Sequence, residues 1–251
     1  MNFSIRATQH LGKQIFHYSS CDSTNFQAQQ LLREGQAEHG ALVYTDHQTA
    51  GRGQQGSDWE AAPSQNLTVS LILFPALTVE EQHWLTIVAS LSVHDTISPW
   101  LSQPPAIKWP NDILCESSKI CGILIQNNLK GRKIHSSVIG VGLNVNQTMF
   151  AVPGATSLAL LTGQRWNRQE VLTQWAVCAE RRLEQLAHQN FIALRDDYLK
   201  NMFWRGEQHL FEDVQGPFYG TIKGIDARGR LTVETEKEVR YYEVKQLRYQ
   251  R

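Results

Sequence analysis

The segment between residues 106 and 144 carries four strand-like runs with no helical pattern between them. The runs lie at residues 106–109, 113–115, 120–126 and 134–144, and only a few residues separate each run from the next. Parallel neighbours in a sheet need a crossover of roughly a dozen residues or more, which is usually a helix. Strands that follow one another directly therefore build a mixed or largely antiparallel sheet. This pattern predicts an α+β fold.

Other elements are expected on both sides of this segment. Asp22, Ser23 and Thr24 supply side chains that favour a helix N-terminus, and Gly35 ends the helical pattern that follows them. Further strands are expected at 13–18, 41–45 and 66–74, and further helices at 78–98, 167–188 and 191–203. From about residue 205, apolar and polar residues alternate around two tight turns, which predicts a small β-barrel. The expected domains are residues 1–203 and residues 204–251.

Composition limits the classes of function. The 251 residues include 24 basic and 24 acidic side chains, so the formal net charge is zero. This balance lacks the general attraction to phosphate backbones that nucleic-acid-binding proteins use, so we expect no nucleic-acid partner. Apolar runs stay well short of the roughly 18 residues that span a bilayer, and the N-terminus lacks the apolar core of a secretory signal. We expect a cytoplasmic protein with no membrane partner.

The cysteines and histidines show no ligand pattern. Cys21, Cys115, Cys121 and Cys178 form no C-x-x-C pair, and the nine histidines show no metal-ligand spacing. A chain of this length does not need disulfide cross-links, so a reducing compartment is expected. The simplest interpretation is four free thiols, most of them buried, although Cys115 and Cys121 would lie near each other if their segments pair.

Residues 51–56 read GRGQQG and match the G-x-G-x-x-G pattern of dinucleotide-binding loops. That pattern requires a helix directly after the glycines, whereas here Pro63 and then a strand follow. Protein kinases place a similar loop between two strands, but this chain contains no H-R-D or D-F-G sequence. What remains is a strand–loop–strand crossing that presents three glycines and Arg52. Such a loop suits an anionic ligand, and a flexible surface turn explains it equally well.

A second cluster of polar residues follows in the strand-rich segment. Residues 108–112 read KWPND, which places a cation, an aromatic ring, an amide and a carboxylate at the end of a strand. A surface ion pair between Lys108 and Asp112 is the simpler alternative for these five residues alone. Lys119 directly precedes an apolar strand, and residues 140–144 (GVGLN) form a glycine-spaced strand end. Together with the glycine loop, these segments favour a binding site for anions.

The motifs as a set resemble those of biotin–protein ligases, which are also called biotin–[acetyl-CoA-carboxylase] ligases. The shared motifs are Ser23-Thr24-Asn25, Gln48 with GRGQQG, KWPND, K-x-x-G-I-L and G-x-G-x-N, and they occur here in the family's order. The resemblance covers about residues 13–146, and the C-terminal segment resembles the family's small SH3-like domain. It implies the class II synthetase-like fold of biotin and lipoate ligases, with an SH3-like β-barrel appended.

The resemblance also implies a reaction in two steps. Biotin and ATP give biotinyl-5′-AMP and pyrophosphate, and a lysine of a carrier protein then takes the biotin and releases AMP. The first step joins two anions, so cations, Mg²⁺ and positioning supply most of the catalysis. Lys119 stands at the position of the family's catalytic lysine, where it would lie between the biotin carboxylate and the α-phosphate. Arg52 would add to the same positive field.

Site residues follow by the same resemblance. ATP would be bound by Lys108, Asn111, Asp112, Lys119 and Asn144, and Asp112 would be the Mg²⁺ ligand. Biotin would be bound by Ser23, Thr24, Asn25, Gln48, Gly51, Arg52, Gly53, Gln54, Lys119, Gly122, Ile123 and Gly142. Ser23 and Thr24 would also serve as an ordinary helix cap, and Trp59 and Trp109 are interpreted as packing residues.

One departure from the family affects the glycine loop. Many members carry a second arginine there, whereas this chain has Gln54 and Gln55. Fewer cations near the adenylate phosphate should weaken its retention, so we expect a leakier adenylate than in doubly basic relatives.

The resemblance also implies a protein partner, and it leaves two alternative functions open. The protein partner would be a biotin carboxyl carrier domain of acetyl-CoA carboxylase or of another biotin-dependent carboxylase, and a homodimer is possible. Only about 22 residues precede Ser23, which is too few for a DNA-binding domain, so a single-function ligase is expected. The alternatives are a lipoate or octanoate ligase of similar fold and a biotin-binding sensor without catalysis.

Overall fold

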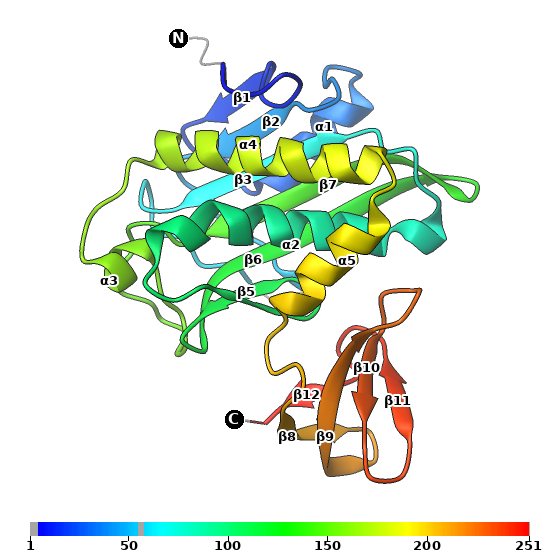
Figure 1. The fold of residues 1–251 in the computed structure, drawn as a ribbon. Coiled ribbons are helices and arrows are strands. Elements are labelled where there is room, and N and C mark those ends of the chain that lie inside the picture. The colour runs from blue at the N-terminus through cyan, green and yellow to red at the C-terminus, as the bar shows by residue number, and fades with distance from the viewer. Residues whose placement is uncertain (1–4, 55–57, 251) are drawn as a thin grey trace.

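The structure is a computed structural model that describes residues 5–54 and 58–250. These residues form a seven-stranded sheet with helices and, at the C-terminal end, a five-stranded sheet (Figure 1). The larger part contains β1 (Ile15–Tyr18), α1 (Thr24–Arg33), β2 (Leu42–Thr45), β3 (Leu67–Leu73), η2 (Val79–Glu81), α2 (His83–Ile97), η3 (Ser98–Trp100), β4 (Ala106–Lys108), β5 (Asp112–Cys115), β6 (Ser118–Lys130), β7 (Lys133–Leu143), α3 (Leu158–Thr162), α4 (Arg168–Ala187) and α5 (Phe191–Lys200).

The larger sheet has the strand order β1-β2-β3-β7-β6-β5-β4. Only the β1–β2 pair is parallel, and every other neighbouring pair is antiparallel. The mixed, largely antiparallel sheet is therefore confirmed. The longest pair is β6–β7, and β5 joins only the first part of β6, from Ser118 to Gly122.

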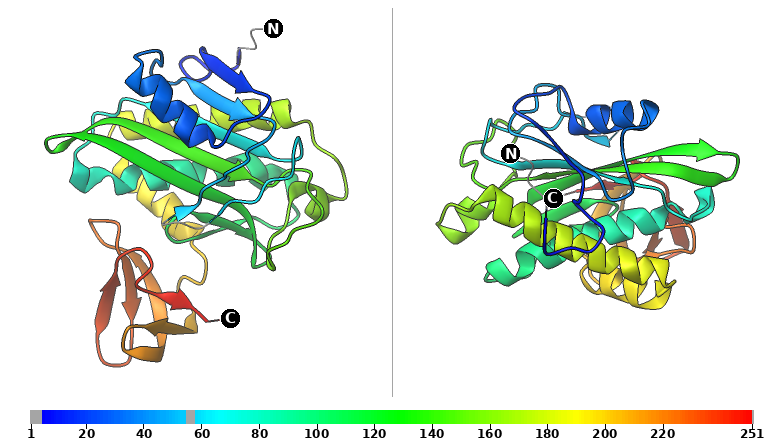
Figure 2. Two further views of the ribbon diagram at one scale, coloured as in Figure 1. Left: turned by 180° about the vertical axis from the view of Figure 1, so that it is seen from behind. Right: turned by 90° about the horizontal axis from the view of Figure 1, so that it is seen from above.

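Helices cover the two faces of this sheet unequally. Helices α2, α4 and α5 pack together on one face, whereas α1 lies on the other face against β2, β3 and β7 (Figure 2). Every side chain of β3 is buried, as a strand covered on both faces requires. Ala28 and Leu31 of α1 form a small separate core with residues of β2, β3 and β7.

One helix prediction needs correction, and one helix was missed. The run expected at 78–98 is interrupted: η2 comes first, with a capping box between Thr78 and Glu81, and α2 then begins at His83. Helix α3 was not predicted, because five residues give too little periodicity for recognition. Its N-terminus is fixed by the Ser157 hydroxyl, which accepts a hydrogen bond from the Leu160 amide.

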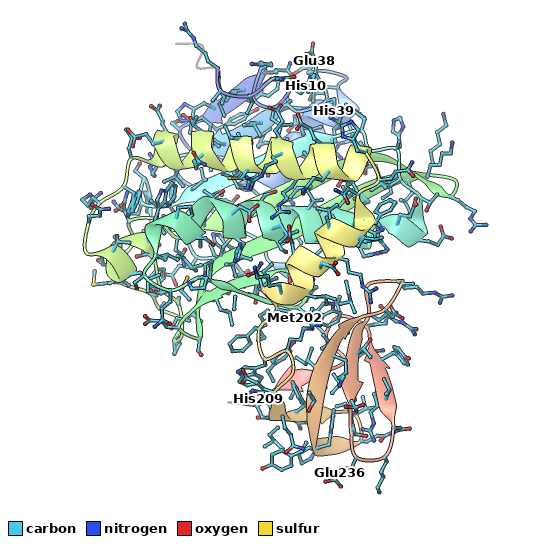
Figure 3. The ribbon with its side chains drawn as sticks, viewed as in Figure 1. His10, Glu38, His39, Met202, His209 and Glu236 are labelled. Carbon is cyan, nitrogen blue, oxygen red and sulfur yellow. The ribbon has the colours of Figure 1, made fainter. Side chains whose placement is uncertain are left out.

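The smaller sheet contains β8 (Gln208–Asp213), β9 (Gly216–Ile225), β10 (Leu231–Glu234), β11 (Val239–Tyr242) and β12 (Arg248–Tyr249), in the order β11-β10-β9-β8-β12. All its neighbouring pairs are antiparallel, and Phe211, Ile222 and Val233 are fully buried. The predicted small β unit is confirmed. Figure 3 shows Met202 where the chain passes from α5 towards this sheet.

All four cysteines are free, and burial raises the pKa of the Cys115 thiol to about 12. His10 and His39 lie near each other above the larger sheet, whereas His209 lies in the smaller one (Figure 3). Across residues 5–54 and 58–250, no three His, Cys, Asp or Glu side chains form a metal-binding group. In the same ranges, no helix is long and apolar enough to cross a membrane.

Candidate active site

A cavity of about 670 Å³ opens beside β5, β6 and β7. The loop after β2, the start of α1 and the last residues of the smaller sheet complete its walls. All the site residues proposed from the motifs line this cavity, except Gly51 and Asn144. Segments that are far apart in sequence therefore meet in one place.

One end of the cavity is a network of uncharged polar groups. The Thr24 amide donates a 2.9 Å hydrogen bond to Gln48 Oε1. The Ser70 hydroxyl lies 2.8 Å from Thr24 Oγ1 and 2.7 Å from Asn25 Oδ1. The Asn25 amide in turn donates to the Leu124 carbonyl at 3.2 Å. This network fixes the orientation of the side chains that a neutral, hydrogen-bonding ligand would meet.

Ser70 was missed by the sequence analysis. It lies in the middle of β3, in a run of apolar residues that looks like plain core, and it is completely buried. A buried hydroxyl needs a partner, and here the partners are the two motif residues Thr24 and Asn25. Ser23 occupies the N-cap backbone position of α1, but its side chain makes no capping hydrogen bond. The interpretation of the Ser23 side chain as an ordinary helix cap is therefore wrong.

The floor of the cavity consists of two glycines that face each other across β6 and β7. Gly122 pairs with Gly142 in the register of these strands. A Cβ atom on Gly142 would lie 2.6 Å from Trp59 Nε1, and one on Gly122 would lie 3.1 Å from Trp59 Cζ3 and 3.2 Å from Lys119 Nζ. Only glycine leaves room at these positions for the indole and the lysine.

Trp59 and Trp109 have different roles. Trp109 is buried in the main core, as the packing interpretation expected, and its indole donates to the Gly229 carbonyl at 3.0 Å. Both residues line the cavity, but only Trp59 meets the charged end, where its ring lies 5.7 Å from Lys119 Nζ. Its indole N–H is buried without a hydrogen-bond partner in the described ranges. The only sequence signal for this role was its position just after the glycine loop.

The charged end of the cavity is organised around Lys119 and Asp112. Lys119 Nζ lies 2.8 Å from Asp112 Oδ1, and about a third of each side chain is exposed. Asp112 lies opposite Gly122 in the β5–β6 register, which brings its carboxylate next to the start of β6. Arg52 and Lys108 line the same cavity and add two more cations. This is a strongly polar site in which a lysine is held by a carboxylate.

The KWPND segment is anchored from three directions. The Asn111 amide donates to the Ile123 carbonyl of β6, and the Tyr198 hydroxyl of α5 donates to the Pro110 carbonyl at 2.9 Å. The third anchor is the bond from Trp109 to Gly229 in the smaller sheet. The Trp109–Pro110 peptide bond is cis. Because the Asn111 side-chain nitrogen already donates to Ile123, its side-chain oxygen is the atom that can accept a hydrogen bond from a ligand.

Two proposed residues lie behind the cavity wall. Asn144 is buried, and its amide donates to the Thr156 carbonyl at 2.9 Å, while its side-chain oxygen has no partner among residues that the structure describes. The Gly51 carbonyl accepts a hydrogen bond from the Trp59 amide. Both positions support the site from outside, so direct contact of Asn144 with ATP and of Gly51 with biotin stays a prediction. Gln55 lies outside the described residues.

The donor set for a divalent cation is small. Magnesium in nucleotide sites is usually held by one or two carboxylates and by the phosphates of the substrate. Asp112 supplies one carboxylate in the polar end of the cavity, and Lys119 already contacts it. The residues therefore fit an ion that arrives with phosphate groups rather than a cage built by protein alone.

Comparison with known proteins identifies the class to which this fold and site belong. The sequence profile of the biotin/lipoate A/B protein ligase family matches residues 18–144. That match covers half of the chain, and the chain belongs to this family.

Within the family, several biotin ligases are similar to this chain. The chain is 31% identical over 228 residues to a biotin–[acetyl-CoA-carboxylase] ligase of Mycobacterium tuberculosis, covering 88% of this chain and 84% of that one. It is 30% identical over 238 residues to the bifunctional ligase/repressor BirA of Bacillus subtilis, covering 93% and 73%. The biotin protein ligase of Aquifex aeolicus in complex with biotin and ATP superposes with a TM-score of 0.77 at 25% identity, covering 95% and 100%.

Proposed function

We propose that this protein activates biotin with ATP and transfers it to a lysine of a biotin carboxyl carrier domain of acetyl-CoA carboxylase. The main support for this proposal is that one cavity contains both an uncharged polar slot and the Lys119–Asp112 ion pair. The names of the similar proteins agree with this chemistry. A neutral bicyclic ring system suits the first half of the cavity, and two anions suit the second.

In the first step, a biotin carboxylate oxygen forms a bond to the α-phosphorus of ATP. The bond from that phosphorus to the bridging oxygen breaks, and pyrophosphate leaves with its electron pair. Lys119 would lie between the two anions and reduce their repulsion, while Asp112 keeps its ammonium in place. Arg52 would add positive charge from the glycine loop.

In the second step, the neutral amine of the carrier lysine attacks the carbonyl carbon of the mixed anhydride. The carbon–oxygen bond to AMP breaks, an amide forms, and the amine loses a proton. The adenylate must stay in the cavity until the carrier arrives, so the cations that hold its phosphate serve this step as well.

Biotin would occupy the uncharged slot beside the paired glycines and the Trp59 ring that packs on them. Thr24, Gln48 and Ser23 would meet its ureido ring, and Gly122 would let its aliphatic chain lie along the strand backbone. Ile123 and Leu124 supply apolar wall. Trp59 packs directly on the two glycines, on the face where their Cβ atoms would project, and its ring extends the apolar wall of the slot.

ATP would occupy the opposite end, near Lys108, Asn111 and Asp112. Mg²⁺ would be held by Asp112 together with the ATP phosphates, where it would offset their negative charge during the first step.

We place the boundary between a catalytic domain and an SH3-like domain at residues 203–204. We assign the protein to the cytoplasm, where ATP, biotin and the carrier protein are available. We assign it no nucleic-acid partner.

The test is transfer of labelled biotin to a purified carrier domain, preceded by biotin-dependent exchange of pyrophosphate into ATP. Lys119→Ala should abolish exchange while leaving thermal unfolding close to wild type, because the side chain is partly exposed. A fully active Lys119→Ala variant would refute its role. Exchange that occurs only with lipoate or octanoate would assign the protein to the other branch of the family, and binding of biotin without exchange would make it a sensor.

A further inference from the structure

The C-terminal sheet forms one wall of the nucleotide end of the cavity. Glu212 of β8 and several residues between 244 and 250 line the cavity together with Lys108 and Asp112. Lys245 Nζ also donates to the Gln54 carbonyl of the glycine loop at 3.3 Å. The smaller sheet is therefore in contact with both cationic segments of the site. It is not a separate appendage.

Tyr249 makes the most specific of these contacts. The residue belongs to β12, which pairs with β8 through only two residues, Arg248 and Tyr249. Its ring packs 5.4 Å from the Phe211 ring and 5.6 Å from the Trp204 ring, so the smaller sheet fixes its orientation. Lys108 Nζ lies 4.6 Å from the centre of the same ring. That distance is well within the range of a cation–π interaction.

The Tyr249 hydroxyl makes no hydrogen bond within the described part of the site, so the aromatic ring is the part of this side chain that interacts with Lys108. The hydroxyl is buried and has no hydrogen-bond partner in the part of the chain that the structure describes. Tyrosine is already neutral at physiological pH, and burial and, to a smaller extent, the negative charge of Asp112 raise the pKa of Tyr249 further. A neutral ring keeps the negative face that attracts an ammonium group.

We propose that Tyr249 is a positioning residue that holds the Lys108 ammonium at the nucleotide end of the cavity. This inference rests on the function proposed above, in which Lys108 contacts ATP. A lysine has a flexible four-carbon stem, so an unheld ammonium must be ordered each time a phosphate binds. The Tyr249 ring orders it in advance, and the C-terminal sheet thereby determines how well ATP is used.

The experiment compares ATP and biotin kinetics in pyrophosphate exchange. Tyr249→Met removes the aromatic face and keeps an apolar side chain, and it should raise the KM for ATP roughly threefold to thirtyfold. The KM for biotin should change by less than about twofold, since the contact lies at the other end of the cavity. Tyr249→Phe keeps the ring and should restore the ATP KM.

A matched control exists in the same sheet. Tyr241 also lies under a cation, with Arg230 at 5.1 Å from its ring, but it does not line the cavity. Tyr241→Met should leave both KM values unchanged. If Tyr241→Met raises the ATP KM as much as Tyr249→Met does, the effect belongs to the stability of the sheet and the proposal fails.

A mutant cycle separates positioning from packing. In a Lys108→Met background, Tyr249→Met should have no further effect on the ATP KM; an effect of full size there would overturn the proposal. If Tyr249→Met does not fold, phenylalanines with increasing ring fluorination at position 249 give the same test. Fluorination weakens the negative face of the ring with little change of shape, so the ATP KM should rise stepwise. A constant ATP KM across that series would also overturn the proposal.

The two proposals fail in different ways. If wild-type protein shows no biotin-dependent exchange, the proposed function is wrong. If wild type is active and the Tyr249 variants match the Tyr241 control, only the positioning role is wrong.

Discussion

Replacing Gly142 by alanine tests the geometry of the proposed biotin slot. The added methyl group would lie 2.6 Å from Trp59 Nε1 and 2.8 Å from Trp59 Cζ2, whereas ordinary contact begins at 3.4 Å. Trp59 Cε2 would be closer still, so the indole must retreat by roughly 1 Å, and excess packing of this kind costs about 1–3 kcal/mol. Because Trp59 forms part of the wall of the slot, a displaced indole should impair biotin binding. The corresponding loss in kcat/KM for biotin is about 5-fold to 150-fold.

The assay is biotin-dependent pyrophosphate exchange with biotin varied at saturating ATP. Gly220→Ala is the matched control, since its methyl group would lie 2.6 Å from Val233 Cγ1 in the smaller sheet, away from the slot. It should lower thermal stability and leave the biotin KM unchanged. In a Trp59→Leu background, Gly142→Ala should cost little more. An unchanged biotin KM in Gly142→Ala, or an equal loss in the Trp59→Leu background, would refute the geometric reasoning.

Three further predictions concern other parts of the molecule. Ser70→Ala removes the hydroxyl that supports Thr24. The biotin KM should rise by about threefold to tenfold, which is the equivalent of one hydrogen bond, while the ATP KM stays constant. A biotin KM equal to that of wild type would contradict the proposed network. Burial acts to raise the pKa of Asp95, but hydrogen bonds from His94 and Arg182 outweigh it and lower that pKa. Asp95→Asn should therefore cost about 1–3 kcal/mol of unfolding free energy at pH 7. Because the pKa of Asp95 is lower in the folded state, its carboxylate stabilises the fold above the unfolded-state pKa of about 3.9, and this stabilisation is lost as the pH falls. The difference in unfolding free energy between wild type and Asp95→Asn, measured by urea titration, should therefore shrink below about pH 4. A difference that stays constant with pH would contradict the assignment. Gln55→Arg should slow release of biotinyl-AMP, as measured by dilution of preformed complex, and equal release rates would show that the second cation is unimportant.

Most of the fold could be predicted because its strands are strongly patterned. The runs between residues 106 and 144 are apolar, short and closely spaced, and such runs have few alternatives to antiparallel pairing. The predictions failed where local signals were weak. Polar Asn127 and Asn128 continue β6 because β7 offers register partners, and sequence alone gives no such information. Helix α3 owes its existence to a capping serine and to neighbouring segments rather than to its own propensity.

The proposed site could be predicted only where its residues form compact motifs. KWPND and the glycine loop are recognisable because several unusual residues stand close together in sequence. Ser70 and Tyr249 carry no such signal, since each is a single residue within a strand whose neighbours look ordinary. Their contacts to the motif residues span 45 residues for Ser70 to Asn25, and far more for Tyr249 to Lys108. Only tertiary structure brings partners that distant together.

The distribution of charge explains how a chain of zero net charge can serve two anionic substrates. Arg52, Lys108 and Lys119 all line one cavity, whereas the carboxylate that meets them most directly is Asp112. The charged side chains that line this cavity are five cations (Arg52, Lys108, Lys119, Lys245 and Arg248) and three carboxylates (Asp58, Asp112 and Glu212), so the cavity keeps a local excess of positive charge. Opposite charges at a few ångströms interact more strongly in a partly enclosed cavity than in open water. The excess also explains why the cations need restraint: Lys119 is held by Asp112, and Lys108 by the ring of Tyr249. Neither restraint adds a second full negative charge, so both lysines are fixed in place without cancelling the field that ATP and biotin require.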